Sequence, residues 1–275
     1  MKKNLLILSL AGMATVLSAE SKSFDGYSYG GIGFESATYK EAHGSLKSSA
    51  KGSSPVYTTG SLVRVNDRYD FSLDFSSTLL PSTITEKWSN SSGTILTDDY
   101  ALLANSAQIL VHYKLTPQHR IVVGPYYVLN TFKRYNQIAI DPTQVVVVPG
   151  VTEEQSASVS GLIGYWYESS TAALEGWRYK GSALVSHPLW QKTTNTASTG
   201  DIAFSDIGGY NVDISAYVGY TLFKGFEIGT FAGYNRQQRN GGGPKLDSVG
   251  NHVTWPENTL TTYRAGVNAV WHFRD

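Results

Sequence analysis

The stretch that decides the fold is residues 69–79, which read YDFSLDFSSTL. Its odd positions hold Tyr69, Phe71, Leu73, Phe75, Ser77 and Leu79, and its even positions hold Asp70, Ser72, Asp74, Ser76 and Thr78. The first set is almost wholly apolar and the second is wholly polar. Because successive side chains of a β-strand point to opposite faces, this period of two predicts a strand with one apolar face and one polar face.

The same alternation recurs along the chain and predicts ten strands. We expect them at about 24–38, 54–66, 67–79, 99–115, 119–136, 155–168, 174–190, 207–222, 225–239 and 258–274. Several of these segments are longer than the roughly 9–11 residues that a tilted strand needs to cross a bilayer. Some strands should therefore project beyond a membrane.

The connections between these strands alternate in length. Short turns are expected at 66–67, 116–118, 169–173 and 224–225, and long polar loops at 39–53, 80–98, 137–154, 191–206 and 240–257. Short turns at one end and long loops at the other are typical of outer-membrane barrels, whose short turns face the periplasm. A soluble antiparallel barrel or sandwich also has one apolar face per strand, but it has no reason to sort its connections in this way.

The composition excludes several other classes of protein. The chain of 275 residues is 41% hydrophobic and 16% charged, with 22 basic and 22 acidic residues and no cysteine. A disordered chain needs high net charge and few aromatics, and nucleic-acid binding needs a basic surface. No segment after the N-terminus has about 18 consecutive apolar residues, which excludes a bundle of membrane helices. The absence of cysteine excludes disulfides and a thiol nucleophile.

The N-terminus predicts export. Residues 1–3 are Met-Lys-Lys, residues 5–17 are mainly apolar, and the small pair Ser18-Ala19 follows. This is the layout of a secretory signal peptide, here residues 1–19, and the apolar run is too short for a membrane-spanning helix. We expect residues 20–275 to form one transmembrane antiparallel up-and-down β-barrel with five long extracellular loops.

Aromatic residues favour the membrane barrel over the soluble alternative. They stand on the apolar face near strand ends, as in the aromatic girdles of barrels: Tyr69, Tyr113, Tyr127, Tyr165, Tyr167, Trp177, Tyr179, Trp271 and Phe273. The opposite face carries charged residues in mid-strand, which a membrane barrel must turn toward its lumen.

The signal peptide, the ten segments and the final Tyr263…Trp271-His272-Phe273 resemble Gram-negative outer-membrane β-barrel proteins. The last strand resembles the one that the outer-membrane assembly machinery recognises, although Arg274-Asp275 follow the aromatic that normally ends such chains. The resemblance implies the outer membrane of a Gram-negative bacterium as location. It also implies contact with outer-membrane lipid and lipopolysaccharide, and a small porin-like or structural surface role.

The polar face predicts a charged lumen. Its expected members are Arg64, Asp70, Asp74, His112, Lys114, Arg120, Glu168, Arg178, Lys180, Asp213, Glu227, Arg264 and His272. Because an unpaired buried charge is costly, we expect cross-strand pairs, with Asp70 and Asp74 facing basic partners. Such charges could line a pore constriction or cross-link a narrow barrel. Interiors of about eight strands are filled by side chains, whereas open porins need about 16–18, so cross-linking is favoured.

Enzymatic hypotheses find weaker support. Outer-membrane proteases of the omptin family carry an Asp-x-His pair, and none of the six histidines has an aspartate two residues before it. Outer-membrane lipid hydrolases use His-x-Ser on a strand, and His43-Gly44-Ser45 matches that spacing within a predicted loop. The apolar segment 145–151 could be a hairpin that extends above the membrane, a loop folded into the barrel mouth, or the adhesive patch of a loop-based adhesin or binding protein. We predict no catalytic activity, no cofactor and no metal site.

Overall fold

The computed structural model describes residues 25–145, 147, 150–169, 176–195, 202–205, 208–223, 225–246, 250 and 252–273. The predicted signal peptide lies outside this part of the chain. The described residues form fourteen strands and no helix. The strands are β1 (Asp25–His43), β2 (Leu46–Arg64), β3 (Tyr69–Thr78), β4 (Thr83–Asn90), β5 (Gly93–Lys114), β6 (His119–Ala139), β7 (Thr152–Glu168), β8 (Gly176–Asn195), β9 (Ile202–Ser205), β10 (Gly209–Phe223), β11 (Phe226–Arg239), β12 (Gly242–Leu246), β13 (His252–Trp255) and β14 (Glu257–Phe273). In this part of the chain, no helix has the length and apolarity needed to cross a membrane.

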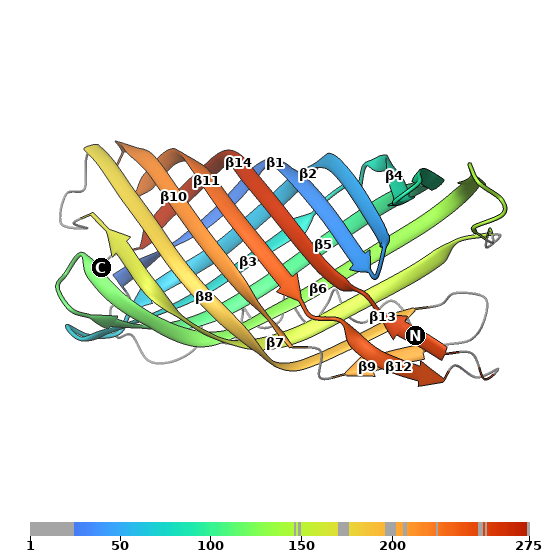
Figure 1. The fold of residues 1–275 in the computed structure, drawn as a ribbon. Coiled ribbons are helices and arrows are strands. Elements are labelled where there is room, and N and C mark those ends of the chain that lie inside the picture. The colour runs from blue at the N-terminus through green and yellow to red at the C-terminus, as the bar shows by residue number, and fades with distance from the viewer. Residues whose placement is uncertain are drawn as a thin grey trace, which may run out of the picture.

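Ten long strands form a closed antiparallel ring (Figure 1). Their order is β1-β2-β3-β5-β6-β7-β8-β10-β11-β14, and β14 pairs with β1 to close the ring. The predicted fold class, an all-β barrel of about ten strands, is confirmed. The short strand β4 pairs with β2 and β5, β9 pairs with β8, and β12 and β13 form a separate hairpin.

Alternation sorts the side chains between the lumen and the outer surface. On β3, Phe71 is 43% exposed while its neighbour Asp70 is 1% exposed. The outward positions form an apolar belt around the ring, which includes Ile32, Phe34, Tyr57, Phe71, Phe75, Ile109, Val111, Val123, Ile163, Val185, Ile214, Val218, Ile228 and Val267. The belt is the surface that lipid covers in a barrel of this kind.

The outward positions become polar away from the termini. On β6 they change from Val123 to Lys133, and on the paired strand β7 from Ile163 to Glu153. We call the region beyond the belt the outer extension. It consists of β4, β9, β12, β13 and the neighbouring ends of the ring strands (Figure 1). The opposite end, where Asp25 begins β1 and the short turns lie, is the one that the sequence analysis expects to face the periplasm, and we call it the periplasmic end.

Two periplasmic turns are held by side chains that accept backbone hydrogen bonds. The Asn66 side-chain oxygen accepts from the backbone N–H groups of Arg68 and Tyr69, at 2.8 and 2.9 Å. The Thr116 hydroxyl accepts from the N–H groups of Gln118 and His119, at 3.3 and 3.1 Å. Such Asx and Thr turns supply locally the bonds that the strand ladders no longer provide.

The outer connections differ from the prediction of long loops. Residues 39–53 belong mostly to β1 and β2, which run without interruption to a tight turn at Gly44, where φ is 58°. Residues 80–98 likewise form β4 and the start of β5. The sequence did not show these strands because outward residues beyond the belt face water, so both faces can be polar. Of the apolar segment 145–151, the structure describes only residues 145, 147, 150 and 151.

Candidate functional site: the charged lumen

The structure places the charged residues singled out in the sequence on inward positions. They are Arg64, Asp70, Asp74, His112, Lys114, Arg120, Glu168, Arg178, Lys180, Asp213, Glu227, Arg264 and His272, and all are buried or half-buried. The aromatic residues of the opposite face point outward: Tyr69, Tyr113, Tyr127, Tyr165, Tyr167, Trp177, Tyr179, Trp271 and Phe273.

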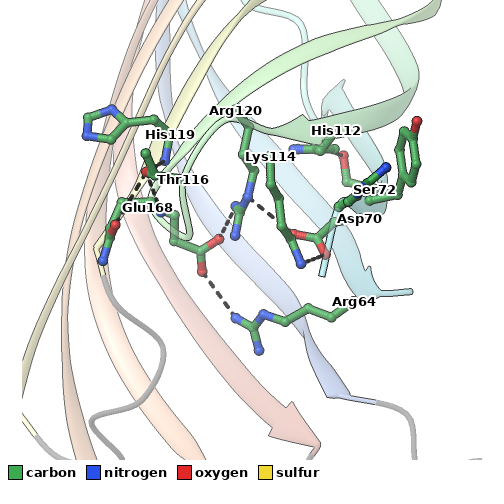
Figure 2. A network of polar contacts seen from close by, with 12 residues as sticks. Arg64, Asp70, Ser72, His112, Lys114, Thr116, His119, Arg120 and Glu168 are labelled. Atoms are coloured by element: carbon green, nitrogen blue, oxygen red, sulfur yellow. Dashed lines mark hydrogen bonds and ion pairs between the residues drawn. The ribbon is translucent and has the colours of Figure 1, made fainter. Parts of the chain in front are cut away.

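Glu168 is the centre of an ion-pair network at the periplasmic end (Figure 2). Its carboxylate oxygens lie 2.7 Å from Arg120 Nη1, 2.9 Å from Arg178 Nη2 and 3.7 Å from Arg64 Nη2. Arg64 is on β2 and Glu168 on β7, and three ring strands separate these two strands along the shorter path. The contact therefore crosses the lumen.

A second carboxylate, Asp70, extends the network along the wall of the barrel. Its two oxygens lie 2.7 Å from Lys114 Nζ and 3.2 Å from Arg120 Nε. Figure 2 shows Arg120 reaching both Asp70 and Glu168. Because Arg120 is 1% exposed, its charge depends on these two carboxylates for compensation.

Glu227 completes the network on the other side of the lumen. It lies 3.1 Å from Arg178 Nε and 2.9 Å from His272 Nε2. The network comprises four carboxylates, those of Asp25, Asp70, Glu168 and Glu227, and four cations, those of Arg64, Lys114, Arg120 and Arg178. Its formal charges thus cancel without counting the histidine, and the side chains of all four cations are at most 13% exposed.

Apolar side chains fill the lumen next to this network, which the polar pattern of the sequence did not predict. One cluster contains Tyr27, Leu62, Tyr217 and Val270, and another contains Leu110, Val122, Tyr126, Val128, Leu162 and Leu184. Lys180 Nζ stands 3.7 Å from the centre of the Tyr27 ring and 4.8 Å from that of Tyr217. This cation–π contact also joins strands on different sides of the ring.

A cavity of about 180 Å³ lies in the middle of the barrel, lined by both polar and aromatic residues. Asp74 lines it, as Lys180 does from β8, but among the ion pairs between described residues none joins Asp74 to a basic residue of a neighbouring strand, so the prediction that this carboxylate faces a basic partner is wrong. It instead accepts hydrogen bonds from Tyr29 at 2.9 Å and from Ser72 and Gln108 at 3.3 Å each. The adjacent strands β2 and β5 place Gly60 and Gln108 beside Asp74, and Gly60 leaves room for the Tyr29 side chain from β1. The cavity has room and partners for several water molecules.

An Arg134 cluster in the outer extension was missed at the sequence level. Arg134 lies 3.1 Å from Glu41, 2.6 Å from Glu86 and 3.4 Å from Glu154, and so ties β6 to β1, β4 and β7. Its guanidinium also stands over three aromatic rings, those of Tyr39, Trp88 and Tyr100. Arg120 and Arg134 both stand at even-numbered positions of β6, so the alternation places both on the inward face. This was the one feature of the sequence that could have identified the cluster. The partners of Arg134 fell in or beside predicted loops.

The Arg134 cluster contains more carboxylates than cations. Asp98, which accepts a hydrogen bond from Trp88 at 3.2 Å, is a fourth carboxylate beside the three that Arg134 contacts. Burial, reinforced by the charge of Glu86, raises the pKa of Asp98 to about 7. Burial also raises the pKa of Glu154 to about 8, although Arg134 opposes that rise. The cluster therefore retains protons near neutral pH.

Two inward histidines contact polar side chains of the lumen: His112 Nε2 lies 2.9 Å from the Ser72 hydroxyl, and His272 contacts Glu227. Among the ion pairs between described residues, a histidine takes part in one, His272–Glu227, at the periplasmic end. His43 ends β1 and Ser45 lies in the adjoining turn, both exposed at a hairpin tip. His43 is thus on a strand and not in the predicted loop. Within the same described ranges, no group of three or more His, Asp or Glu side chains is arranged to hold a metal ion.

No protein-family model matches the chain, and no curated protein matches its sequence. Its structure is similar to that of the outer membrane protease OmpT from Escherichia coli, with a TM-score of 0.64 at 11% identity, covering 92% of this chain and 99% of that one. The P. putida toluene transporter TodX aligns with a TM-score of 0.41 at 8% identity, covering 93% and 91% of the two chains. OprG from Pseudomonas aeruginosa aligns with a TM-score of 0.36 at 11% identity, covering 91% and 97%.

At sequence identities of 8% to 11%, the similarity to these structures shows the fold alone. Three observations agree with one another: the structural similarity to OmpT, the closed ring of ten strands, and the apolar belt formed by the outward side chains. A closed ring leaves no unpaired strand edge in the hydrocarbon, and the belt matches the surface that lipid covers. The chain has the closed antiparallel β-barrel fold of the outer-membrane protein to which it is similar.

Proposed function

We propose that this protein is a structural barrel of the outer membrane whose lumen does not conduct solutes and whose outer extension is a rigid surface platform. The observation that carries the proposal is the bridge across the lumen from Arg64 through Glu168 to Arg178. Glu168 is 1% exposed, and its partners come from β2, β6 and β8. Side chains occupy the lumen at this level.

Further bridges support the same interpretation at other heights. Asn130 on β6 donates to Gln237 on β11 at 2.9 Å, and three ring strands separate these two strands. In the outer extension Arg134 joins its own strand to three others, as described above. A narrow barrel filled at several heights gains stability from these contacts, whereas a diffusion pore needs a continuous aqueous path.

We assign the protein no catalytic step. In this proposal, the outer extension is the part of the molecule that is exposed at the cell surface. Paired strands continue into this region instead of ending at the belt, and Arg134 holds them together. A small porin-like channel is the competing function, and conductance separates the two.

The test is single-channel recording of the refolded full chain in planar bilayers. The wild-type protein should give no discrete conductance steps. The double substitution Arg120→Ala with Glu168→Ala removes a cation and a carboxylate together and should open a narrow path that conducts. The matched control is Lys133→Ala with Glu153→Ala, which removes an exposed ion pair outside the lumen (3.2 Å) and should stay silent. Reproducible steps from folded wild-type protein would refute the proposal and favour the channel.

A further inference from the structure

The cavity in the middle of the barrel contains two charged side chains that take part in no ion pair. Lys180 lines it from β8, and Asp213 lines it from the neighbouring strand β10. Among the ion pairs between described residues, none includes either side chain. The other charged residues of the lining are engaged, because Arg264 lies 3.3 Å from Glu35 and Asp74 accepts three hydrogen bonds from neutral side chains.

Both charged groups have unused hydrogen-bonding capacity. Lys180 Nζ lies 3.7 Å from the centre of the Tyr27 ring and 4.8 Å from that of Tyr217, and the hydrogen bonds between described residues include none from its three N–H donors. Asp213 Oδ2 accepts from Asn235 at 3.1 Å, and within the same described ranges no donor reaches Oδ1. Enclosed charges are normally paired, because an unpaired charge is costly to take out of water. The cavity therefore offers one cation and one anion to a ligand.

The strand register separates these two charges along one polar wall. Asp213 is the register partner of Leu184, four residues along β8 from Lys180. At about 3.3 Å per residue and about 4.8 Å between strands, the Cα atoms of Lys180 and Asp213 are about 14 Å apart. The hydroxyls of Ser182 and Ser215, 2.7 Å from each other, lie between them. A ligand that reaches both charges needs charged groups at its two ends.

Gly233 of β11 leaves space beside these hydroxyls. It is the register partner of Ser215, and a Cβ atom at this position would have the backbone oxygen of Ile214, 3.7 Å away, as its nearest neighbour outside the adjoining residues. The cavity measures about 180 Å³, and Trp166 and Phe231 add apolar surface to its lining. Since an engineered cavity of about 150 Å³ holds benzene, a ligand of about six to nine non-hydrogen atoms fits.

The cavity is enclosed along the barrel axis. Glu168 is the register partner of Lys180, so the periplasmic ion-pair network borders one end of the cavity (Figure 2). At the other end, Gln237 donates to Asn235 at 3.3 Å and accepts from Asn130, across the lumen, at 2.9 Å. Shielding from bulk water strengthens any charge pairing inside.

We propose that the cavity binds a small zwitterion, an amino acid whose ammonium and carboxylate groups are separated by a short chain. Its carboxylate pairs with Lys180, its ammonium pairs with Asp213, and its methylene groups lie against the aromatic lining. A zwitterion suits the cavity better than a simple cation, a simple anion or a sugar, because it pairs both charges and brings no net charge into the barrel. Binding needs no continuous path through the lumen, so this proposal and the structural role proposed above fail separately.

The experiment measures equilibrium binding of radiolabelled γ-aminobutyrate to the full-length protein, refolded in uncharged detergent with the probe present. The unlabelled competitors are γ-aminobutyrate, its neighbours β-alanine and 5-aminopentanoate, and the singly charged butylamine and butyrate. Losing one hydrogen bond to a charged group weakens binding by roughly 10- to 100-fold. Butylamine and butyrate should therefore compete at least about tenfold more weakly than the best of the three zwitterions.

The test variants remove one charge each or fill the cavity. Lys180→Met and Asp213→Asn should each weaken binding by roughly tenfold or more, and Gly233→Val should abolish it without changing any charge. The matched controls are Lys192→Met and Asp67→Asn, whose side chains are exposed outside the lumen, and they should bind like the wild type.

Resistance to SDS before heating checks that each variant is folded. If none of the three zwitterions shows saturable binding to folded wild-type protein, the proposal is wrong. Equal competition by butylamine or by butyrate would show that one charge suffices and would overturn the assignment to a zwitterion. Binding that survives all three test variants would place the probe outside the cavity and would overturn the site.

Discussion

Replacing Glu168 by glutamine should destabilise the barrel strongly while leaving its shape almost unchanged. The carboxylate oxygens of Glu168 lie 2.7 Å from a guanidinium nitrogen of Arg120, 2.9 Å from one of Arg178 and 3.7 Å from one of Arg64. The amide of glutamine has nearly the same size but no charge, and it offers one accepting oxygen where the carboxylate offers two. The periplasmic network would then hold four cations against three carboxylates.

The magnitude follows from the burial of this network. Breaking a buried ion pair by removing one partner costs about 3–5 kcal/mol, because the remaining charge stays out of water without compensation. Arg120 keeps Asp70, and Arg178 keeps Glu227, so neither loses every partner. We therefore expect a loss of about 3 kcal/mol in the free energy of unfolding, at the lower end of that range.

The assay is equilibrium urea unfolding of the refolded protein, followed by tryptophan fluorescence. The control is Glu153→Gln on the same strand, whose ion pair with Lys133 has side chains 32% and 44% exposed. Exposed pairs contribute about 0–1 kcal/mol, so the control should lose little stability. If Glu168→Gln loses less than about 1 kcal/mol, or no more than the control, the network does not hold the barrel together in the way described.

Three further outcomes follow from the described contacts. Because the pKa values of Asp98 and Glu154 are raised to about 7 and 8, the folded outer extension binds these protons more tightly than the unfolded chain, and its stability should fall as the pH rises from about 5 to 8. Amide hydrogen exchange of β4 and β5 measures this, and Glu154→Gln should flatten the dependence. Arg134→Met should leave the acidic partners of Arg134, such as Glu86, buried without a cation, and limited proteolysis should then cut β4 while the belt stays protected. Asn66→Ala removes the acceptor for two turn amides and should cost about 1 kcal/mol in the same urea titration, whereas an unchanged midpoint would show that water replaces the side chain.

The strands and the two faces of each were predictable because alternation is a local property. In residues 69–79, each apolar side chain has a polar neighbour, and that contrast exists only where one face meets lipid and the other meets the lumen. The contrast disappears in the outer extension, where both faces can be polar. The sequence therefore did not reveal that β1 and β2 continue to Gly44, nor that β4 is a strand.

The sequence by itself determined the class of fold and the inward and outward positions on each strand, since these depend on neighbours along the chain. Only the tertiary structure decided which charges meet. Closing the ring sets the stagger of the strands, and the stagger decides that Glu168 reaches Arg64 across the lumen, that Asp74 accepts a hydrogen bond from Tyr29, and that Glu41 and Glu154 converge on Arg134. Partners of this kind lie on strands far apart in the chain, and no pattern of local periodicity contains the stagger that brings them together.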